Sequence, residues 1–178
     1  MSDWLPGDKR ADTASMLRVN QAGEYGATRI YAGQLAVLAR GSAASHQIAR
    51  MAAQEERHLD RFNQLMAARR VRPTLLQPVW NVAGFALGAA TALISEQAAM
   101  ACTDAVETEI DKHYAAQLAE LGDSEPELAA DIAEFQAEEL EHRATARAHG
   151  AQDAVGYPLL TAAIRAGCRL AIGLSKRI

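Results

Sequence analysis

The pattern of apolar and polar positions along the chain predicts a helical protein. Four long stretches have a helical pattern with no proline in their middle. They cover about residues 15–40, 42–68, 95–121 and 124–149. Glycine, which is typical of helix ends, follows three of them. We therefore predict four core helices, preceded by a loose arm over residues 1–14.

Capping residues mark two of the helix starts. Either Ser42 or Ser45 is suited to cap the second helix. The run Ser124-Glu125-Pro126-Glu127 predicts a capping box with proline in the first turn of the fourth. Between the second and third helices, Pro73 and Pro78 indicate a linker.

An uncharged segment follows that linker. Residues 79–94 contain no charged side chain, and Arg69, Arg70 and Arg72 precede them. A membrane-spanning helix needs about 20 apolar residues, so this run is too short to span a bilayer. The basic flank favours a helix that lies in a bilayer surface, whereas the composition fits a buried helix equally well. We take residues 75–101 as one candidate membrane-facing segment.

The C-terminal segment, residues 157–178, is amphipathic. Its leucines, isoleucine and alanines form an apolar band, while Arg165 and Arg169 share another face. This pattern predicts either a second membrane- or partner-facing helix or a helix packed on the bundle.

Composition limits the fold and the partners. A chain of 178 residues with 49% hydrophobic and 5% aromatic residues is long enough for one helical core, so we expect a single all-α domain over residues 15–178. The formal net charge of −4 gives no general attraction to nucleic acid, and we expect no nucleic-acid partner.

The cysteines and the N-terminus indicate a reducing compartment. Cys102 and Cys168 are single and far apart, which predicts neither a disulfide framework nor a cysteine-bound metal. Residues 1–18 have no apolar core like that of a signal peptide, and they contain three aspartates. We expect a protein on the cytoplasmic side of a bacterial cell.

A repeated motif carries the chemistry. The sequence Glu-x-x-His occurs twice, and a residue pair with this spacing lies about 60° apart around a helix, near enough to hold one metal ion. A lone glutamate precedes each motif, by 31 residues in the first half and 32 in the second. These are the ligands of a two-metal carboxylate site in a four-helix bundle. The predicted ligands are Glu24, Glu55, His58, Glu107, Glu139 and His142.

The spacing also indicates an internal repeat and assigns roles. Glu24 and Glu107 are 83 residues apart, and Glu55 and Glu139 are 84 apart. By analogy with such sites, Glu55 and Glu139 would bridge two irons, and the other four residues would each hold one. Glu138 is an alternative partner for His142, but the first motif has glutamine at the equivalent position, so symmetry favours Glu139. The sequence alone leaves iron and manganese open.

Two tyrosines stand seven residues after the lone glutamates. Tyr31 should lie over Glu24 and Tyr114 over Glu107, where they are either core residues or groups that bond to the ligands or carry electrons. We expect His113 to point elsewhere, toward the surface or the rim of a pocket. Three other glutamates are assigned to solvent: Glu56, Glu109 and Glu141.

Five segments resemble the demethoxyubiquinone hydroxylase family of ubiquinone biosynthesis, and the likeness extends over residues 15–178. The segments are Asn20–Ala27, Val71–Thr74, Trp80–Gly88, Ala99–Thr103 and Glu138–His142. The resemblance implies a ferritin-like fold in which all six ligand positions hold the expected residue. It also implies an O2-dependent di-iron monooxygenase that hydroxylates the ring of 2-polyprenyl-3-methyl-6-methoxy-1,4-benzoquinol.

The resemblance further implies peripheral attachment to the cell membrane and contact with other ubiquinone-synthesis proteins. The electron donor, NADH or another reductant, and a homo-oligomeric state are left open. Three competing classes share part of the pattern: a ferroxidase or iron-storage protein, a di-iron tRNA hydroxylase, and a metal-free helical scaffold. The uncharged segment disfavours the first, and the net charge disfavours the second.

Overall fold

Helices make up nearly all of the described chain. The computed structural model describes residues 11–177, so most of the predicted N-terminal arm, residues 1–10, lies outside it, as does residue 178. The elements are α1 Thr13–Val37, α2 Ala43–Arg69, α3 Gln77–Ile94, α4 Glu96–Leu121, α5 Pro126–Ala148, the 3-10 turn η1 Ala151–Asp153 and α6 Tyr157–Ser175. No strand occurs within residues 11–177, and the all-α prediction is confirmed.

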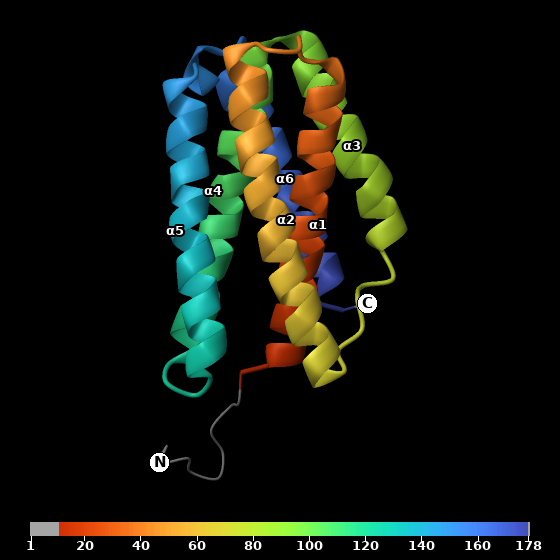
Figure 1. The fold of residues 1–178 in the computed structure, drawn as a ribbon, viewed down its shortest axis with the longest axis vertical. Coiled ribbons are helices and arrows are strands. Elements are labelled where there is room, and N and C mark those ends of the chain that lie inside the picture. The colour runs from red at the N-terminus through yellow and green to blue at the C-terminus, as the bar shows by residue number, and fades with distance from the viewer. Residues whose placement is uncertain (1–10, 178) are drawn as a thin grey trace.

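Two helical hairpins form the bundle. α1 packs along α2 and α4 packs along α5, and the two hairpins face each other in the four-helix arrangement expected of a ferritin-like fold (Figure 1). The remaining helices lie outside this bundle, α3 against α1 and α6 against α4. The repeat is therefore larger than the predicted hairpin, because each half contains a third helix that covers the first.

Side-chain caps set the starts of three of the six described α-helices, α1, α2 and α4. The carboxylate of Asp12 accepts a hydrogen bond from the Ser15 amide, so α1 begins two residues earlier than predicted. Of the two proposed caps for α2, Ser42 accepts from the amide of Ser45. The predicted capping box of α5 is wrong, since its N-cap makes no side-chain hydrogen bond and the Ser124 hydroxyl donates back to a carbonyl of the preceding turn.

Apolar layers fill the bundle at both ends. One layer joins the start of α1 to the end of α2 and to α4 and α5; it contains Met16, Leu17, Phe62, Leu65, Met66, Tyr114, Leu121, Leu128, Ile132 and Phe135. A second layer, rich in alanine, occupies the opposite end. Polar residues placed midway along the helices are therefore separated from water above and below.

Glycines let α3 lie directly on α1. A Cβ atom added at Gly33 would stand 2.1 Å from the carbonyl oxygen of Phe85, and one added at Gly88 would stand 1.9 Å from that of Ile30. The two backbones are thus in contact where the helices cross. This explains why the uncharged segment is rich in glycine, and it shows that one face of that segment is packed on the bundle.

The other faces of α3 and α6 are apolar and exposed. The exposed large side chains on or beside these helices are Leu75, Val79, Val82, Phe85, Leu93, Ile94, Val155, Leu159 and Leu170. The indole nitrogen of Trp80 donates a 3.2 Å hydrogen bond to the Ser175 hydroxyl, which brings the start of α3 to the end of α6. None of the described helices combines the length and apolarity needed to cross a bilayer.

Candidate metal centre

Four helices deliver the predicted ligands to the middle of the bundle. α1 carries Glu24, α4 carries Glu107, and α2 and α5 each carry one Glu-x-x-His pair. None of the six residues is more than 2% exposed. Carboxylates are rarely buried so completely unless they are paired or bind a cation. The structure thus brings together all six residues that the spacing selected.

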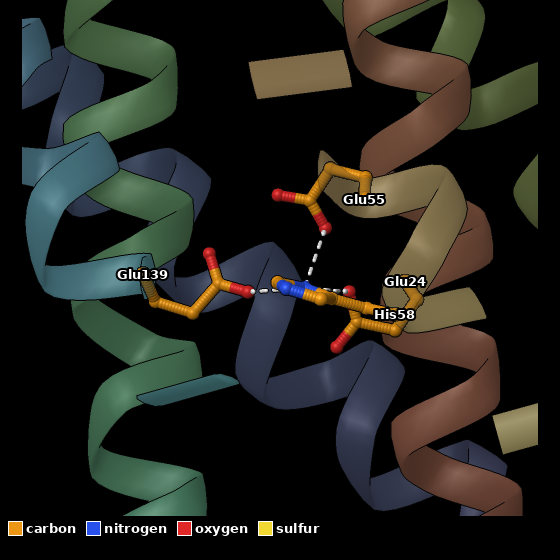
Figure 2. A group of neighbouring side chains, drawn as sticks. All are labelled: Glu24, Glu55, His58 and Glu139. Carbon is orange, nitrogen blue, oxygen red and sulfur yellow. Dashed lines mark ion pairs between the residues drawn. The ribbon is translucent and has the colours of Figure 1, made fainter. Parts of the chain in front are cut away.

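Two overlapping groups of four residues result. In each group, one oxygen or nitrogen atom from every residue lies within 4.8 Å of the others. The first group contains Glu24, Glu55, His58 and Glu139, and Figure 2 shows these side chains converging from opposite sides of the bundle. The second group contains Glu55, Glu107, Glu139 and His142. Glu55 and Glu139 occur in both groups, which is the arrangement expected of bridging carboxylates.

Both imidazoles present Nδ1 to the carboxylates. The Nδ1 atom of His58 lies 3.2 Å from Glu139 Oε1 and 3.5 Å from Glu24 Oε2 (Figure 2). The Nδ1 atom of His142 lies 3.1 Å from an oxygen of Glu55 and 3.1 Å from one of Glu139. Phe135 stacks on the His58 ring at a centroid distance of 4.1 Å, which holds its plane.

The outer nitrogen of each histidine contacts the opposite half of the repeat. His58 Nε2 lies 2.7 Å from Glu138 Oε2, and His142 Nε2 lies 3.1 Å from Gln54 Oε1. With a metal bound, hydrogen bonds of this kind would keep the proton on Nε2 and leave the lone pair of the inward Nδ1 for the metal. Sequence reasoning considered Glu138 only as a partner for the histidine of its own helix. The position of Glu138 could have indicated this contact, because Glu138 and Gln54 each directly precede a predicted bridging glutamate.

Two phenols bond to the lone glutamates, but each serves the glutamate of the other half. Tyr31 donates to Glu107 Oε1 at 2.8 Å, and Tyr114 donates to Glu24 Oε1 in a short contact. The sequence placed each tyrosine over the glutamate of its own helix and left its bonding partner open; the structure pairs each hydroxyl with the glutamate of the opposite half. Burial and nearby carboxylates raise the pKa of both phenols, so they remain neutral donors.

His113 lies apart from this centre. It is half-buried and lines a surface cleft of about 210 Å³ together with residues of α1, α4 and Lys176, in agreement with the predicted pocket rim. Burial and the nearby charge of Lys176 lower its pKa to about 4. A role for His113 in electron transfer stays a prediction.

One of the three glutamates assigned to solvent, Glu109, is buried. Glu56 and Glu141 are exposed, as predicted, whereas Glu109 is only 5% exposed. Its carboxylate lies 2.9 Å from Lys112 Nζ and 3.3 Å from a guanidinium nitrogen of Arg169 on α6. The solvent assignment for Glu109 is wrong because α6 covers the side of α4 that faces away from the bundle.

Concentrated negative charge alters proton binding in the cluster. Burial, followed by repulsion between neighbouring carboxylates, raises the pKa of Glu55 well above its ordinary value, and burial likewise raises the pKa of Glu107 and Glu139. Burial lowers the pKa of His58, but the carboxylates of Glu139 and Glu24 beside Nδ1 outweigh this and raise it to about 10. Protons thus compensate the carboxylates of the metal-free protein, as bound cations would.

The donor atoms fit a pair of divalent metal ions. Six buried atoms of the cluster lack a hydrogen-bond partner among the described residues: Glu24 Oε2, Glu55 Oε1 and Oε2, His58 Nδ1, Glu107 Oε2 and Glu139 Oε1. Buried polar atoms without partners are costly, and all of these belong to predicted ligands. Carboxylate oxygens with one imidazole nitrogen for each ion form a donor set suited to iron or manganese.

Comparison with known proteins places the chain in a family. The model of the family "Ubiquinone biosynthesis protein COQ7" matches residues 11–175. The 3-demethoxyubiquinol 3-hydroxylase of Rhodospirillum rubrum is 56% identical over 99% of this chain and 84% of the relative.

Eukaryotic relatives match over a similar length. The mitochondrial NADPH-dependent 3-demethoxyubiquinone 3-hydroxylase of Homo sapiens is 51% identical, over 98% of this chain and 82% of its own. The mitochondrial 5-demethoxyubiquinone hydroxylase of Saccharomyces cerevisiae is 45% identical, over 92% and 77%. A match over almost the whole described chain, together with the buried two-group cluster, shows that this chain belongs to the COQ7 family of ubiquinone biosynthesis proteins.

Proposed function

We propose that the chain is an O2-dependent di-iron monooxygenase that hydroxylates the ring of 2-polyprenyl-3-methyl-6-methoxy-1,4-benzoquinol. The observation that carries the proposal is the pair of buried ligand groups that share Glu55 and Glu139, in a chain whose relatives are named demethoxyubiquinone hydroxylases. In the reaction a ring C–H becomes C–OH, one oxygen atom of O2 enters the product, and the other leaves as water. Two electrons and two protons balance the equation.

Each group of side chains would have its own role at the metal site. Glu55 and Glu139 would bridge the irons, Glu24 with His58 would complete one position, and the corresponding residues of the second half would complete the other. Bound iron would supply the activation of O2. Tyr31 and Tyr114 would hold the terminal carboxylates in place, and the apolar layers at both ends of the bundle would keep water away.

The electron donor is either a nicotinamide or the quinol itself. The human relative is named NADPH-dependent, which makes NADPH the first donor to test, with NADH beside it. A quinol that donates its own electrons is the alternative, and an assay without nicotinamide distinguishes the two.

An apolar route would lead the substrate to the metals from the side covered by α3 and α6. Between α1 and α4, a space too small for a water molecule is lined by Glu107, Tyr31, Thr103 and three apolar residues, among them Ile30 and Val106. The same two residues join an apolar cluster that includes Cys102, Ala105 and Ile164, with Leu87 and Leu160 packed against it. A quinol ring would enter by widening this space.

The exposed faces of α3 and α6 would rest on the membrane that contains the polyprenyl substrate. Nine large apolar side chains on or beside these helices are exposed, and basic residues stand near the start of α3 and the end of α6. This combination suits a helix pair at a lipid surface with anionic headgroups. We expect peripheral attachment, on the cytoplasmic face if the source is bacterial. Contact with other proteins of ubiquinone synthesis, or with further copies of the chain, stays a prediction.

Vesicle flotation tests the membrane surface. Val82→Glu and Leu93→Glu place charges at side chains that are 70% and 74% exposed, so the fold should tolerate them while binding to anionic phospholipid vesicles is lost. A control, Glu56→Lys, changes charge on the exposed side of α2. Undiminished flotation of both glutamate variants would contradict this part of the proposal.

The activity is tested with purified, iron-loaded protein, the quinol substrate in vesicles, NADPH and labelled oxygen gas. We expect two irons per chain and one labelled oxygen atom in the product. Glu55→Ala should abolish hydroxylation and iron retention while the helical circular dichroism survives, and Glu56→Ala, its exposed neighbour, should change neither. Two irons without product in the reduced assay would indicate ferroxidase chemistry instead. Full activity of Glu55→Ala would refute the assignment.

A further inference from the structure

The two predicted metal positions match on the inside of the cluster but differ behind the histidines. Each position has one terminal glutamate, one imidazole Nδ1 and a share of Glu55 and Glu139. Behind His58 stands the carboxylate of Glu138, with Oε2 at 2.7 Å from Nε2. Behind His142 stands the neutral amide of Gln54, with Oε1 at 3.1 Å from Nε2.

Glu138 and Gln54 occupy equivalent positions in the two halves of the repeat, so the halves differ here in the type of residue at one position. Each directly precedes a bridging glutamate, and each contacts the histidine of the opposite half. The two side chains also contact each other, since Gln54 Nε2 donates to Glu138 Oε2 at 3.4 Å. That contact orients the amide so that its oxygen faces His142.

The charge of Glu138 is only partly balanced from outside. Arg57 donates to both of its oxygens at 3.2 Å and 3.0 Å, but the arginine side chain is 56% exposed and that of Glu138 is 21% exposed. Water screens the arginine more strongly than it screens the contact with the buried His58 ring. The imidazole of His58 therefore faces a net negative partner, whereas that of His142 does not.

We propose that Glu138 makes the two metal positions unequal, so that the position held by His58 binds iron more tightly and stabilises its oxidised form. A carboxylate that accepts the Nε2 proton increases the donor strength of Nδ1, and a charge-assisted hydrogen bond is roughly twice as strong as a neutral one. Glu138 acts through His58 and is a positioning residue. The inference rests on the proposed function in that it requires a di-iron site.

Single-position variants allow each affinity to be measured separately. Glu107→Ala removes a terminal ligand of the His142 position, and Glu24→Ala removes the equivalent ligand of the His58 position. Ferrous iron is titrated anaerobically into both proteins, with and without Glu138→Gln. We expect Glu138→Gln to weaken binding about 10- to 100-fold in the Glu107→Ala protein, as loss of an outer partner does, and by less than about threefold in the Glu24→Ala protein. Equal effects in both would overturn the proposal.

The intact site provides a second measurement. Mössbauer spectra of the diferric protein should show two different quadrupole doublets, and Glu138→Gln, which makes both histidines face an amide, should bring them closer together. The exchange variant Gln54→Glu/Glu138→Gln should restore the difference, with the tighter position moved to His142. Doublets that Glu138→Gln leaves unchanged would overturn the proposal, even if activity fell.

The parent protein separates this inference from the proposed function. Two irons in the wild-type chain, without a position-specific effect of Glu138→Gln, contradict only the inequality. A wild-type chain that takes up no iron contradicts both. Circular dichroism and the unfolding temperature are the controls for a general loss of structure. We expect both to be nearly the same for Glu138→Gln and wild type.

Discussion

Tyr31 donates its hydroxyl hydrogen bond to Glu107 on α4, 76 residues away, although Glu24 stands two turns before it on α1. Tyr114 makes the reciprocal contact with Glu24. The two phenols thus cross the interface between the halves of the repeat, and each ties the carboxylate of one half to the first helix of the other. Both tyrosines are only 1% exposed, so water offers no substitute for these donors.

Removing one phenol hydroxyl should weaken metal binding at one position. Tyr31→Phe keeps the ring and leaves the Glu107 carboxylate without its donor, so we expect about 10-fold weaker binding at the position held by His142. Competition with a chelator under anaerobic conditions measures it. Tyr25→Phe, the same change at a half-buried residue of α1, is the control and should have no effect. Equal affinities for all three proteins would show that the hydrogen bond does not support the ligand.

Metal binding should strengthen as the pH rises. The metal-free cluster holds protons, because the pKa values of Glu55, Glu107 and Glu139 are raised above the ordinary 4.5 and that of His58 is raised to about 10. A cation must displace these protons, so affinity should rise about tenfold per pH unit for each proton released.

Titration of manganese(II) from about pH 6 to about pH 8 measures this dependence, and buffers of different ionisation enthalpy count the protons released by calorimetry. An affinity that is constant across the range would contradict the protonated cluster.

The contact between α1 and α3 should not tolerate a methyl group. Gly88→Ala would place Cβ 1.9 Å from the Ile30 carbonyl oxygen, so the helices must separate, at a cost of about 1–3 kcal/mol in the free energy of unfolding. Gly173→Ala on α6 is the matched control. Its Cβ would meet nothing within 4 Å, and alanine in a helix should stabilise by up to about 1 kcal/mol. Urea denaturation measures both; a stabilising Gly88→Ala would disprove the close approach.

A buried carboxylate anchors α5 and α6 to α4. Asp104 is fully buried; its Oδ1 accepts from Arg147 Nε at 2.9 Å, and its Oδ2 accepts from the Tyr157 hydroxyl. Asp104→Asn should lower the free energy of unfolding by about 1.5–3 kcal/mol, the range for hydrogen bonds to charged groups. Glu125→Gln, which loses a half-exposed ion pair with Arg69, should cost only about 0–1 kcal/mol. Thermal unfolding compares them, and equal losses would argue against the anchor.

The local sequence determined the helices and selected the six residues of the buried cluster. Helix bounds follow from caps, glycines and prolines, which act within a few residues, and the structure moves the predicted ends by only a few positions. The six cluster residues could be selected because a 3.6-residue period and the matched spacings of the two halves place them at equivalent levels of the four helices. Iron binding itself, the roles of the ligands and membrane attachment remain predictions.

Contacts between distant segments were decided only by the tertiary structure. Sequence spacing places Tyr31 near Glu24, yet which carboxylate it bonds depends on how α1 meets α4. The sequence predicts Glu109 at the surface, but in the structure α6 covers this residue and Arg169 forms an ion pair with it. Glu138 stands one residue from a predicted ligand, and its contact with His58 arises only when α5 faces α2. Helical periodicity fixes the direction of a side chain on its own helix, whereas its partner depends on the packing of helices far apart in the chain.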